Sequence, residues 1–363
     1  MNEWSHEAEV IDRLLESLRG LPDVRVERVQ PELRSSPNEG SYDARIHLNV
    51  GGKPVTLLVE AKKDVYPRDA RQVLWQFSAL RQRSASVAGS KTQPLLAAES
   101  ISPGAKELLR AHRVGYFDSG GSLFLPAPGA YLYIEKPAPK SLTRSMRSLF
   151  SGRRAQVLHA LLLRPQEWFG VTQIAADSQV APSTASEVLI QLDRYDWLES
   201  QGNGRSKKRK LREPGALLDA WAKQQTLLRP PNARRYYVPG MKAESLVADL
   251  GRIFNRHQVD YAVTAEAAAQ RYTPFLSVLS FIRARVLTGP KADAAVAELD
   301  ARVVNEGSNL ALIETKSAGE LLFREQLDGV WFATPVQVYL DLLRGEGRAK
   351  ELAEHLRRER IRF

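Results

Sequence analysis

The stretch Tyr42–Lys62, which reads YDARIHLNVGGKPVTLLVEAK, decides the fold that the sequence predicts for the first part of this chain. Apolar and polar residues alternate over Ala44–Val50, as they do in a half-buried strand. A second strand is predicted over Val55–Glu60, and Gly51-Gly52 between the two runs is typical of a two-residue hairpin turn. The sequence therefore predicts an antiparallel hairpin.

The open end of this hairpin carries the candidate catalytic residues. Side chains at alternate positions of a strand share a face, so Glu60 and Lys62 point the same way, and the short turn brings Asp43 back beside them. Two carboxylates, with water and a substrate phosphate, suit the octahedral shell of Mg²⁺. A metal there would activate a water, and Lys62 would hold that water or offset phosphate charge. The pattern indicates phosphodiester hydrolysis.

The segments around the hairpin predict an α/β layer fold, because strands alternate with helices. Helices are predicted over Glu3–Arg19, Arg68–Arg83 and Pro103–His112, and further strands over Val24–Val29, Gln93–Ala98, Val114–Phe117 and Ser122–Leu125.

The spacing Asp43-x16-Glu60-x-Lys62 after an N-terminal helix resembles the PD-(D/E)xK restriction-endonuclease-like superfamily, over about residues 1–135. The resemblance implies that Asp43 and Glu60 bind Mg²⁺ (or Mn²⁺) and that Lys62 assists the attacking water. Tyr42 stands where the name of the motif has proline. The motif is degenerate, and this chain holds a second copy of its letters in Asp300…Glu314-Thr-Lys316, where the flanking helices do not match.

The same resemblance implies two further contributions to the site. A glutamate of the first helix often joins the metal ligands, and Glu7 and Glu9 are the candidates here. A glutamine of the helix after the hairpin approaches the site in several branches, which points to Gln72 or Gln76.

The net charge of +10 is unevenly distributed along the chain. Residues 1–139 hold 18 basic and 17 acidic residues, residues 140–235 hold 17 and 8, and residues 236–363 hold 17 of each. Proline-rich stretches near 126–140 and 228–232 fall close to these steps. We therefore expect three domains, over 1–139, 140–231 and 232–363. The basic middle domain predicts a surface for a polyanion, with DNA as the expected partner.

The middle domain resembles a winged helix-turn-helix. Helices are predicted over Arg153–Leu163, Val171–Asp177 and Pro182–Tyr195. The runs Leu198–Gln201 and Lys208–Arg212 are predicted to pair around a turn, and the hairpin Gly202–Lys210 forms the wing. Side chains of the third helix would enter a groove, and cations of the wing would contact phosphates. A solvated basic loop, or a small domain that docks protein, is the alternative. The expected DNA-binding residues are Ser183, Thr184, Gln191, Arg194, Arg205, Lys207, Lys208, Arg209 and Lys210.

The last domain is predicted to be mixed α/β. Together with the winged helix, residues 261–272 and 333–343 resemble the AbiEi family of type IV antitoxins, DNA-binding repressors whose C-terminal domain has a nucleotidyltransferase-like shape. Gly307-Ser308 occurs, but the paired aspartates of a nucleotidyltransferase do not follow it. We therefore expect a non-catalytic domain that contacts DNA or a protein partner such as a toxin. The predicted elements are strands over Asp260–Val263, Val278–Ala284 and Leu310–Glu314, and helices over Ala265–Arg271, Pro335–Leu343 and Arg348–Arg358.

Composition excludes several other classes. The chain has no cysteine, which excludes disulfides and thiolate chemistry and fits a reducing cytoplasm. No apolar run approaches the roughly 18 residues of a membrane helix, and the polar N-terminus is not a secretory signal. No Walker loop or GxGxxG occurs, so a nucleotide cofactor is not expected.

Two functions remain open from the sequence. The first is a metal-dependent DNA endonuclease, in which the winged helix delivers DNA to Asp43, Glu60 and Lys62. The second is a non-catalytic transcriptional regulator of the antitoxin type, in which the nuclease fold is vestigial, since a fold can persist after its chemistry is lost.

Overall fold

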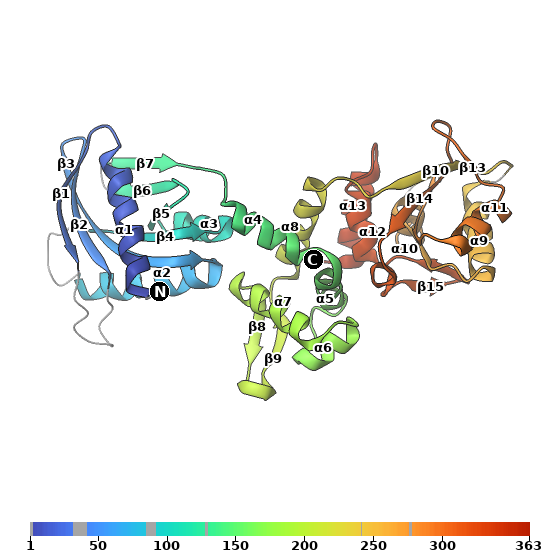
Figure 1. Ribbon diagram of the computed structural model, residues 1–363, viewed down its shortest axis with the longest axis horizontal. Coiled ribbons are helices and arrows are strands. Elements are labelled where there is room, and N and C mark those ends of the chain that lie inside the picture. Colours follow the sequence, from blue (N-terminus) through green and yellow to red (C-terminus); the bar gives the residue numbers. More distant parts are fainter. Residues whose placement is uncertain (1–2, 32–41, 85–91, 128–129, 241, 276–277) are drawn as a thin grey trace. The chain divides into compact units, whose positions relative to one another are not determined.

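The computed structural model describes residues 3–31, 42–84, 92–127, 130–240, 242–275 and 278–363. The chain divides into two compact units, residues 1–146 with 191–196, and residues 147–190 with 197–363. Both units combine helices with a mixed seven-stranded sheet, so the multidomain α/β fold class predicted from the sequence is confirmed (Figure 1).

The first unit follows the predicted order of elements, helix, three strands, helix, strand, helix and strands. Its elements are α1 (Glu3–Arg19), β1 (Val24–Pro31), β2 (Ala44–Val50), β3 (Lys53–Val65), α2 (Pro67–Ser84), β4 (Thr92–Ile101), α3 (Pro103–Ala111), β5 (Gly115–Asp118), β6 (Leu123–Ala127) and β7 (Ala130–Ile134). Helix α4 (Lys140–Leu149) follows.

The seven strands lie in sequential order, β1 to β7, in one sheet. Strands β3, β4 and β5 run parallel, and the other neighbouring pairs are antiparallel. The predicted hairpin is β2–β3, with Ala44 opposite Val59 and Val50 opposite Lys53. Gly51 and Gly52 have φ of 55° and 80°, a left-handed region that side chains disfavour, which explains the two glycines at this turn.

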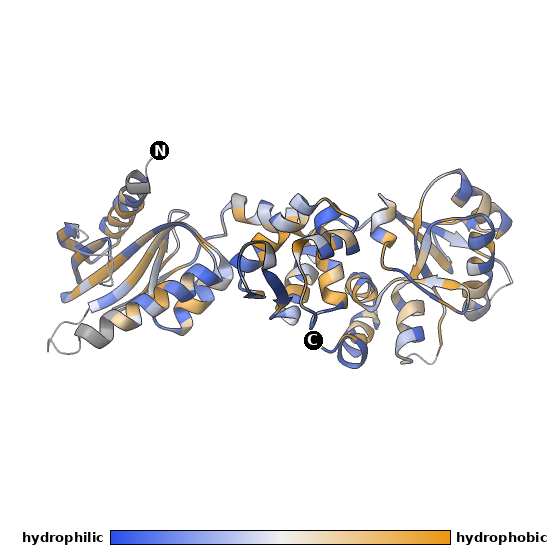
Figure 2. Ribbon diagram, turned by 90° about the horizontal axis from the view of Figure 1, so that it is seen from below, coloured by the Kyte–Doolittle hydropathy of each residue, from blue (hydrophilic) through white to orange (hydrophobic). Residues whose placement is uncertain are grey.

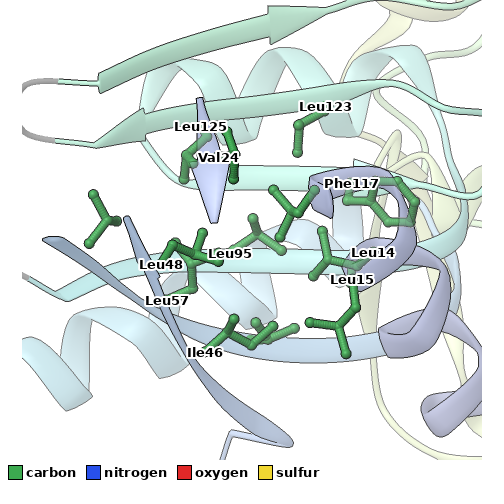
Figure 3. Packing of buried hydrophobic residues seen from close by; sticks show 14 of the residues in the cluster. Leu14, Leu15, Val24, Ile46, Leu48, Leu57, Leu95, Phe117, Leu123 and Leu125 are labelled. Carbon is green, nitrogen blue, oxygen red and sulfur yellow. The ribbon is translucent and has the colours of Figure 1, made fainter. Parts of the chain in front are cut away.

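Alternation along the strands gives this sheet two apolar faces. Helix α1 covers one face, where Leu14, Ile46 and Leu57 are fully buried in a single cluster (Figure 3). Helices α2 and α3 contribute Val73 and Leu109 to a second cluster on the other face. Apolar stripes run along the strands of the sheet (Figure 2). Burial on both faces anchors the hairpin end that carries the polar residues.

The rest of the chain contains further helices, a small ribbon and a second sheet. Its elements are α5 (Gly152–Leu163), α6 (Val171–Asp177), α7 (Pro182–Arg194), β8 (Leu198–Gln201), η1 (Gly204–Ser206), β9 (Lys208–Leu211), α8 (Pro214–Leu227), β10 (Ala233–Tyr237), α9 (Ala243–Arg256), β11 (Tyr261–Thr264), α10 (Ala265–Tyr272), β12 (Ile282–Leu287), α11 (Pro290–Glu298), β13 (Arg302–Val303), β14 (Leu310–Thr315), η2 (Ala318–Leu321), β15 (Glu325–Leu327), β16 (Val330–Phe332), α12 (Pro335–Leu342), α13 (Ala349–Leu356) and η3 (Arg357–Ile361).

The second large sheet has the order β13-β10-β14-β12-β11-β16-β15. Strand β12 runs parallel to β14, and β11 runs parallel to β16, whereas the other neighbouring pairs are antiparallel. The predicted wing is the separate antiparallel ribbon β8–β9.

Several elements differ from the sequence-based expectation. Strand β12 begins at Ile282, four residues after the predicted start at Val278, because the run that pairs in register with β14 begins there. Strand β7 forms inside the proline-rich stretch that we interpreted as a linker, pairing with β6 from Leu123 to Ala127. Four helices, α4, α8, α9 and α11, were not predicted. Within the described residues, no helix is both long and apolar enough to cross a membrane.

Candidate functional site

Asp43 lies directly before β2, at the open end of the hairpin. Its backbone N–H donates to the carbonyl of Val59 at 2.8 Å, which extends the strand pairing by one step. Its Oδ2 accepts a hydrogen bond from the backbone N–H of Ala61 at 2.7 Å. The carboxylate is therefore tied to β3 between Glu60 and Lys62, in the place that the two-glycine turn predicts.

Glu60 and Lys62 share one face of β3, as strand alternation predicts. Lys62 Nζ lies 3.2 Å from Glu60 Oε1, and the two side chains are 29% and 13% exposed. The alternate residues Val59 and Ala61 are buried on the opposite face. The site thus has partly solvated polar groups on a strand that is anchored by its apolar face.

Electrostatic coupling places a third carboxylate near this pair. The pKa of Glu60 is raised above its ordinary value, chiefly by burial and then by the negative charge of Asp43, with a smaller effect of the same sign from Glu7. The charge of Lys62 and its hydrogen bond act in the opposite direction. Carboxylates that raise the pKa of a neighbouring glutamate form an environment that favours a bound cation.

The two candidates on α1 differ in their surroundings. Glu9 is exposed and lies 3.6 Å from the ring of His6, which in turn lies 3.4 Å from Glu99 of β4. Glu7, by contrast, contributes to the raised pKa of Glu60. The structure therefore favours Glu7 over Glu9 as the helix residue at the site.

The two glutamines of α2 also differ. Gln72 is exposed, whereas Gln76 lies between the buried Val73 and Phe77 on the helix. The Oε1 atom of Gln76 is buried and has no hydrogen-bond partner in the described residues. A buried acceptor without a partner calls for a donor, a water or a cation. Gln76 is thus the better candidate of the two, and its approach to the site stays a prediction.

The donor set can be compared with what Mg²⁺ requires. No group of three or more histidine, cysteine, aspartate or glutamate side chains in the described ranges is arranged to hold a metal ion by itself. Mg²⁺ is commonly bound through one or two carboxylates, with waters and substrate phosphates as its other ligands. Asp43 and Glu60 supply that minimum, and the pKa of Glu60 is raised by burial and then by the negative charge of Asp43, a charge that a cation would offset. The residues present therefore fit a Mg²⁺ ion.

In the second copy of the motif, Asp300 and Glu314 have separate ionic partners. Asp300 is exposed and pairs with Arg302 at 3.2 Å, whereas Glu314 of β14 pairs with Arg234 of β10 at 3.1 Å. Each carboxylate thus already has a cationic partner of its own. We therefore do not include this copy among the candidate sites.

The predicted helix-turn-helix corresponds to α5, α6 and α7. At the start of α7, Ser183 is exposed and Thr184 is half-buried, and Arg194 is exposed at its end. Gln191 is half-buried, with an Oε1 atom that is buried and has no hydrogen-bond partner in the described part of the chain. Glu187 and Ile190 are also exposed on this helix. The solvent face of α7 therefore carries an acidic and an apolar residue beside the residues that are expected to contact DNA.

The wing presents fewer free cations than its sequence predicts. Arg209 is only 9% exposed, and its backbone bridges to Phe169, which explains why its side chain turns inward. Lys210 pairs with Glu199 at 3.3 Å and lies 5.0 Å from the ring centre of Trp168. Lys207 is half-buried and Lys208 exposed. Arg205 lies in η1, and its side chain is outside the described part of the structure.

The wing cations differ in their exposure. Strand alternation places Arg209 on the buried side of β9, and its contact with phosphate stays a prediction. Trp168, which was not among the expected DNA-binding residues, supports Lys210. Its position next to Phe169, which pairs with β9, is the signal that could have placed it beside the wing.

Comparisons with known proteins give little further information. No protein-family profile matches the chain, and no curated protein matches its sequence. One similar solved structure is the apo form of EndoMS, with 20% sequence identity and a TM-score of 0.22. The match covers 31% of this chain and 45% of EndoMS, less than half of that protein's length. A likeness of this size carries no argument about function.

Proposed function

We propose that this protein is a Mg²⁺-dependent endonuclease that hydrolyses phosphodiester bonds of DNA. The observation that carries the proposal is the geometry of the hairpin end, where Asp43 is bonded to β3 between Glu60 and Lys62. The raised pKa of Glu60 supports it, because repulsion from Asp43 and Glu7 is relieved by a cation.

Each side chain has a role in this proposal. Asp43 and Glu60 hold the metal ion, and Glu7 adds negative charge on the helix side. When bound, the ion supplies an activated water and stabilises the charge that develops on the phosphate. Lys62 orients the attacking water or balances phosphate charge, from its position beside Glu60.

The winged helix is proposed to bring DNA to this site. Residues 140–235 carry the excess of positive charge, and Lys208 together with Ser183 is exposed there. Cations that contact phosphates give affinity without sequence selection, whereas the start of α7 is where base contacts are made in such domains.

The test is cleavage of supercoiled plasmid DNA with MgCl₂ or MnCl₂, and with EDTA as the metal-free control. We expect nicking by the wild-type chain, and a loss of about 100-fold or more for Glu60→Gln and Lys62→Met, as is typical when a transition-state contact is removed. Glu60→Gln keeps the shape of the side chain and removes its charge.

Asp300→Asn and Glu314→Gln provide matched controls, since they neutralise the aspartate and the glutamate of the second copy of the motif. Both should cleave like the wild type once circular dichroism shows that they fold. Equal cleavage by wild type, Glu60→Gln and Lys62→Met would contradict the proposal, because the activity would then come from elsewhere.

The second candidate function is a non-catalytic DNA-binding regulator of the antitoxin type. It is favoured by the excess of positive charge in residues 140–235, which serves DNA binding without any catalytic step. On this proposal the C-terminal domain contacts a protein partner, such as a toxin. It predicts sequence-selective binding in a gel-shift assay without cleavage in any divalent metal, so the plasmid assay and the gel shift together separate the two functions.

A further inference from the structure

The β1–β2 end of the first sheet has an apolar and a polar face. Directly opposite residues of an antiparallel pair point to the same face, and neighbours in one strand point to opposite faces. Val26 of β1 lies opposite Leu48 of β2, and both pack into the cluster under α1. Arg28 lies opposite His47, and Arg25 precedes Val26. Both arginines therefore lie on the face that α1 does not cover.

This polar face leads directly to the hairpin site. His47 lies opposite both Arg28 and Thr56 of β3, and its Nδ1 lies 3.1 Å from Thr56 Oγ1. Glu60 follows Thr56 by four residues on the same strand and therefore shares its face. Since four residues of a strand span about 13 Å, the row formed by Arg28, His47 and Thr56 lies within reach of the substrate that Glu60 would contact.

Helices α2 and α3 cover a different part of the same face. Leu96 of β4, the register partner of Glu60, packs with these helices in a cluster that also includes β5, β6 and the end of β3. That cluster contains no residue of β1 or β2. Arg25 and Arg28 are exposed, and His47 beside them is half-buried. The polar face is therefore open to solvent along β1 and partly open along β2.

The charge of the two arginines is not offset by an ion pair within the described residues. With its amide oxygen turned toward Arg28, Gln30 accepts hydrogen bonds from Nε and Nη2 at 3.1 and 2.9 Å. This contact orients the guanidinium and leaves its charge unchanged. Glu27, at the register shift between Val26 and Arg28, is the acidic residue of β1, and the sequence of β2 contains none. Positive charge therefore exceeds negative charge on this pair of strands.

A third arginine lies between these residues and the hairpin site. Arg45 of β2 is two residues from Asp43 and lies opposite Gln30. Its guanidinium lies 5.3 Å from the ring centre of Tyr42 and donates a hydrogen bond to the hydroxyl of that residue. Arg45 thus continues the positive charge of the polar face toward the candidate metal ligands.

We infer that this face binds the phosphate backbone of duplex DNA beside the hairpin site. Arginine presents a planar fork of donors that matches phosphate oxygens, and an excess of positive charge favours a polyanion. The inference rests on the proposed function, since it assigns a surface that holds the DNA substrate. Residues 1–139 are nearly neutral as a whole, so the charge count of the sequence does not reveal this surface. We call it the basic face, and it comprises Arg25, Arg28, Arg45, His47 and Asn49.

Fluorescence anisotropy of the full chain with a labelled duplex tests the inference, in EDTA so that no metal-dependent cleavage occurs. Arg25→Gln with Arg28→Gln should weaken binding about tenfold or more, as expected when hydrogen bonds to charged groups are lost. The slope of log affinity against log salt should fall by about 2, since each phosphate contact contributes about 0.9. The loss should be equal on duplexes of different sequence. Arg25→Lys with Arg28→Lys keeps both charges and should retain the slope.

Arg13→Gln with Arg19→Gln is the matched control, because it removes two exposed charges from α1, on the opposite face of the same sheet. It should bind like the wild type once circular dichroism shows that both glutamine variants fold. Three results would overturn the inference: no binding of the duplex by the wild type, equal losses in both glutamine variants, or wild-type affinity and salt slope after Arg25→Gln with Arg28→Gln.

The plasmid assay distinguishes this inference from the proposed function. If the wild type cleaves with Mg²⁺ and Arg25→Gln with Arg28→Gln binds DNA normally, the basic face is refuted and the endonuclease stands. If the double variant loses affinity as expected and the wild type does not cleave, the endonuclease is refuted and the basic face stands as a DNA-binding surface.

Discussion

His159 makes the stability of the second unit depend on pH. The ring is buried in α5, lies 5.0 Å from the ring of Phe323 and contacts Thr334, the residue that caps α12. Burial, aided by the positive charge of Arg285 and opposed by Asp341, lowers the pKa of His159 from 6.5 to about 4. The folded protein thus holds this histidine neutral over a range where the unfolded chain protonates it.

The size of the effect follows from the two pKa values. A depressed histidine pKa gives stability that is present above the unfolded pKa and is lost as the pH falls toward the folded pKa, because protonation then favours the unfolded state. With 6.5 and about 4, the loss between pH 7 and pH 5 is about 2 kcal/mol. His159→Gln removes the titrating group, and its amide can still reach Thr334.

Urea denaturation of the wild type and His159→Gln at pH 7, 6 and 5, followed by tryptophan fluorescence and circular dichroism, measures this difference. Carboxylates titrate in both proteins, so only the difference between the two pH profiles reports on His159. We expect the free energy of unfolding of the wild type to fall by about 2 kcal/mol more than that of the variant. Parallel profiles would refute the reasoning, because His159 would then have the same pKa folded and unfolded.

Three other predictions concern the first unit and the wing. Glu60→Gln should raise the free energy of unfolding at pH 7 while it reduces cleavage, since the raised pKa of Glu60 means that its ionised form costs stability at neutral pH; urea denaturation at pH 7 checks this, and a lower free energy of unfolding would contradict it. Lys106→Met should cost about 3–5 kcal/mol, because it leaves Asp118, 2.7 Å from the Lys106 ammonium and 1% exposed, without a compensating charge. The double variant with Asp118→Asn should recover part of this loss in thermal denaturation, and no recovery would speak against the ion pair. Lys207→Gln with Lys208→Gln should reduce the slope of log affinity against log salt by about 2 in fluorescence anisotropy with duplex DNA, and an unchanged slope would exclude both lysines from phosphate contact.

The sequence by itself determined the hairpin and the residues at its end. Alternation over Ala44–Val50, the turn Gly51-Gly52 and the position of Glu60 and Lys62 on one face are local properties, because a strand has a period of two and a two-residue turn fixes the register. The order of helices and strands in the first unit follows from the same short-range patterns. The site residues proposed here therefore needed no tertiary information to be named.

Only the tertiary structure decided which neighbours join them. Glu7 and Glu9 differ by two positions on one helix, and the packing of α1 on the sheet makes Glu7 the one that acts on Glu60. Arg209 has the same composition signal as Lys208, yet the pairing of its strand buries it.

A cavity of the second unit, lined by His159, Trp221 and Arg285 among others, depends on contacts of still longer range. It brings together α5, α8 and the strand β12, which are separated by up to about 130 residues in the chain. No local pattern reports such a contact, since burial and hydrogen-bond satisfaction are set by groups that are distant in sequence. Periodicity determines which face a residue occupies, and only the packed structure determines what it meets there.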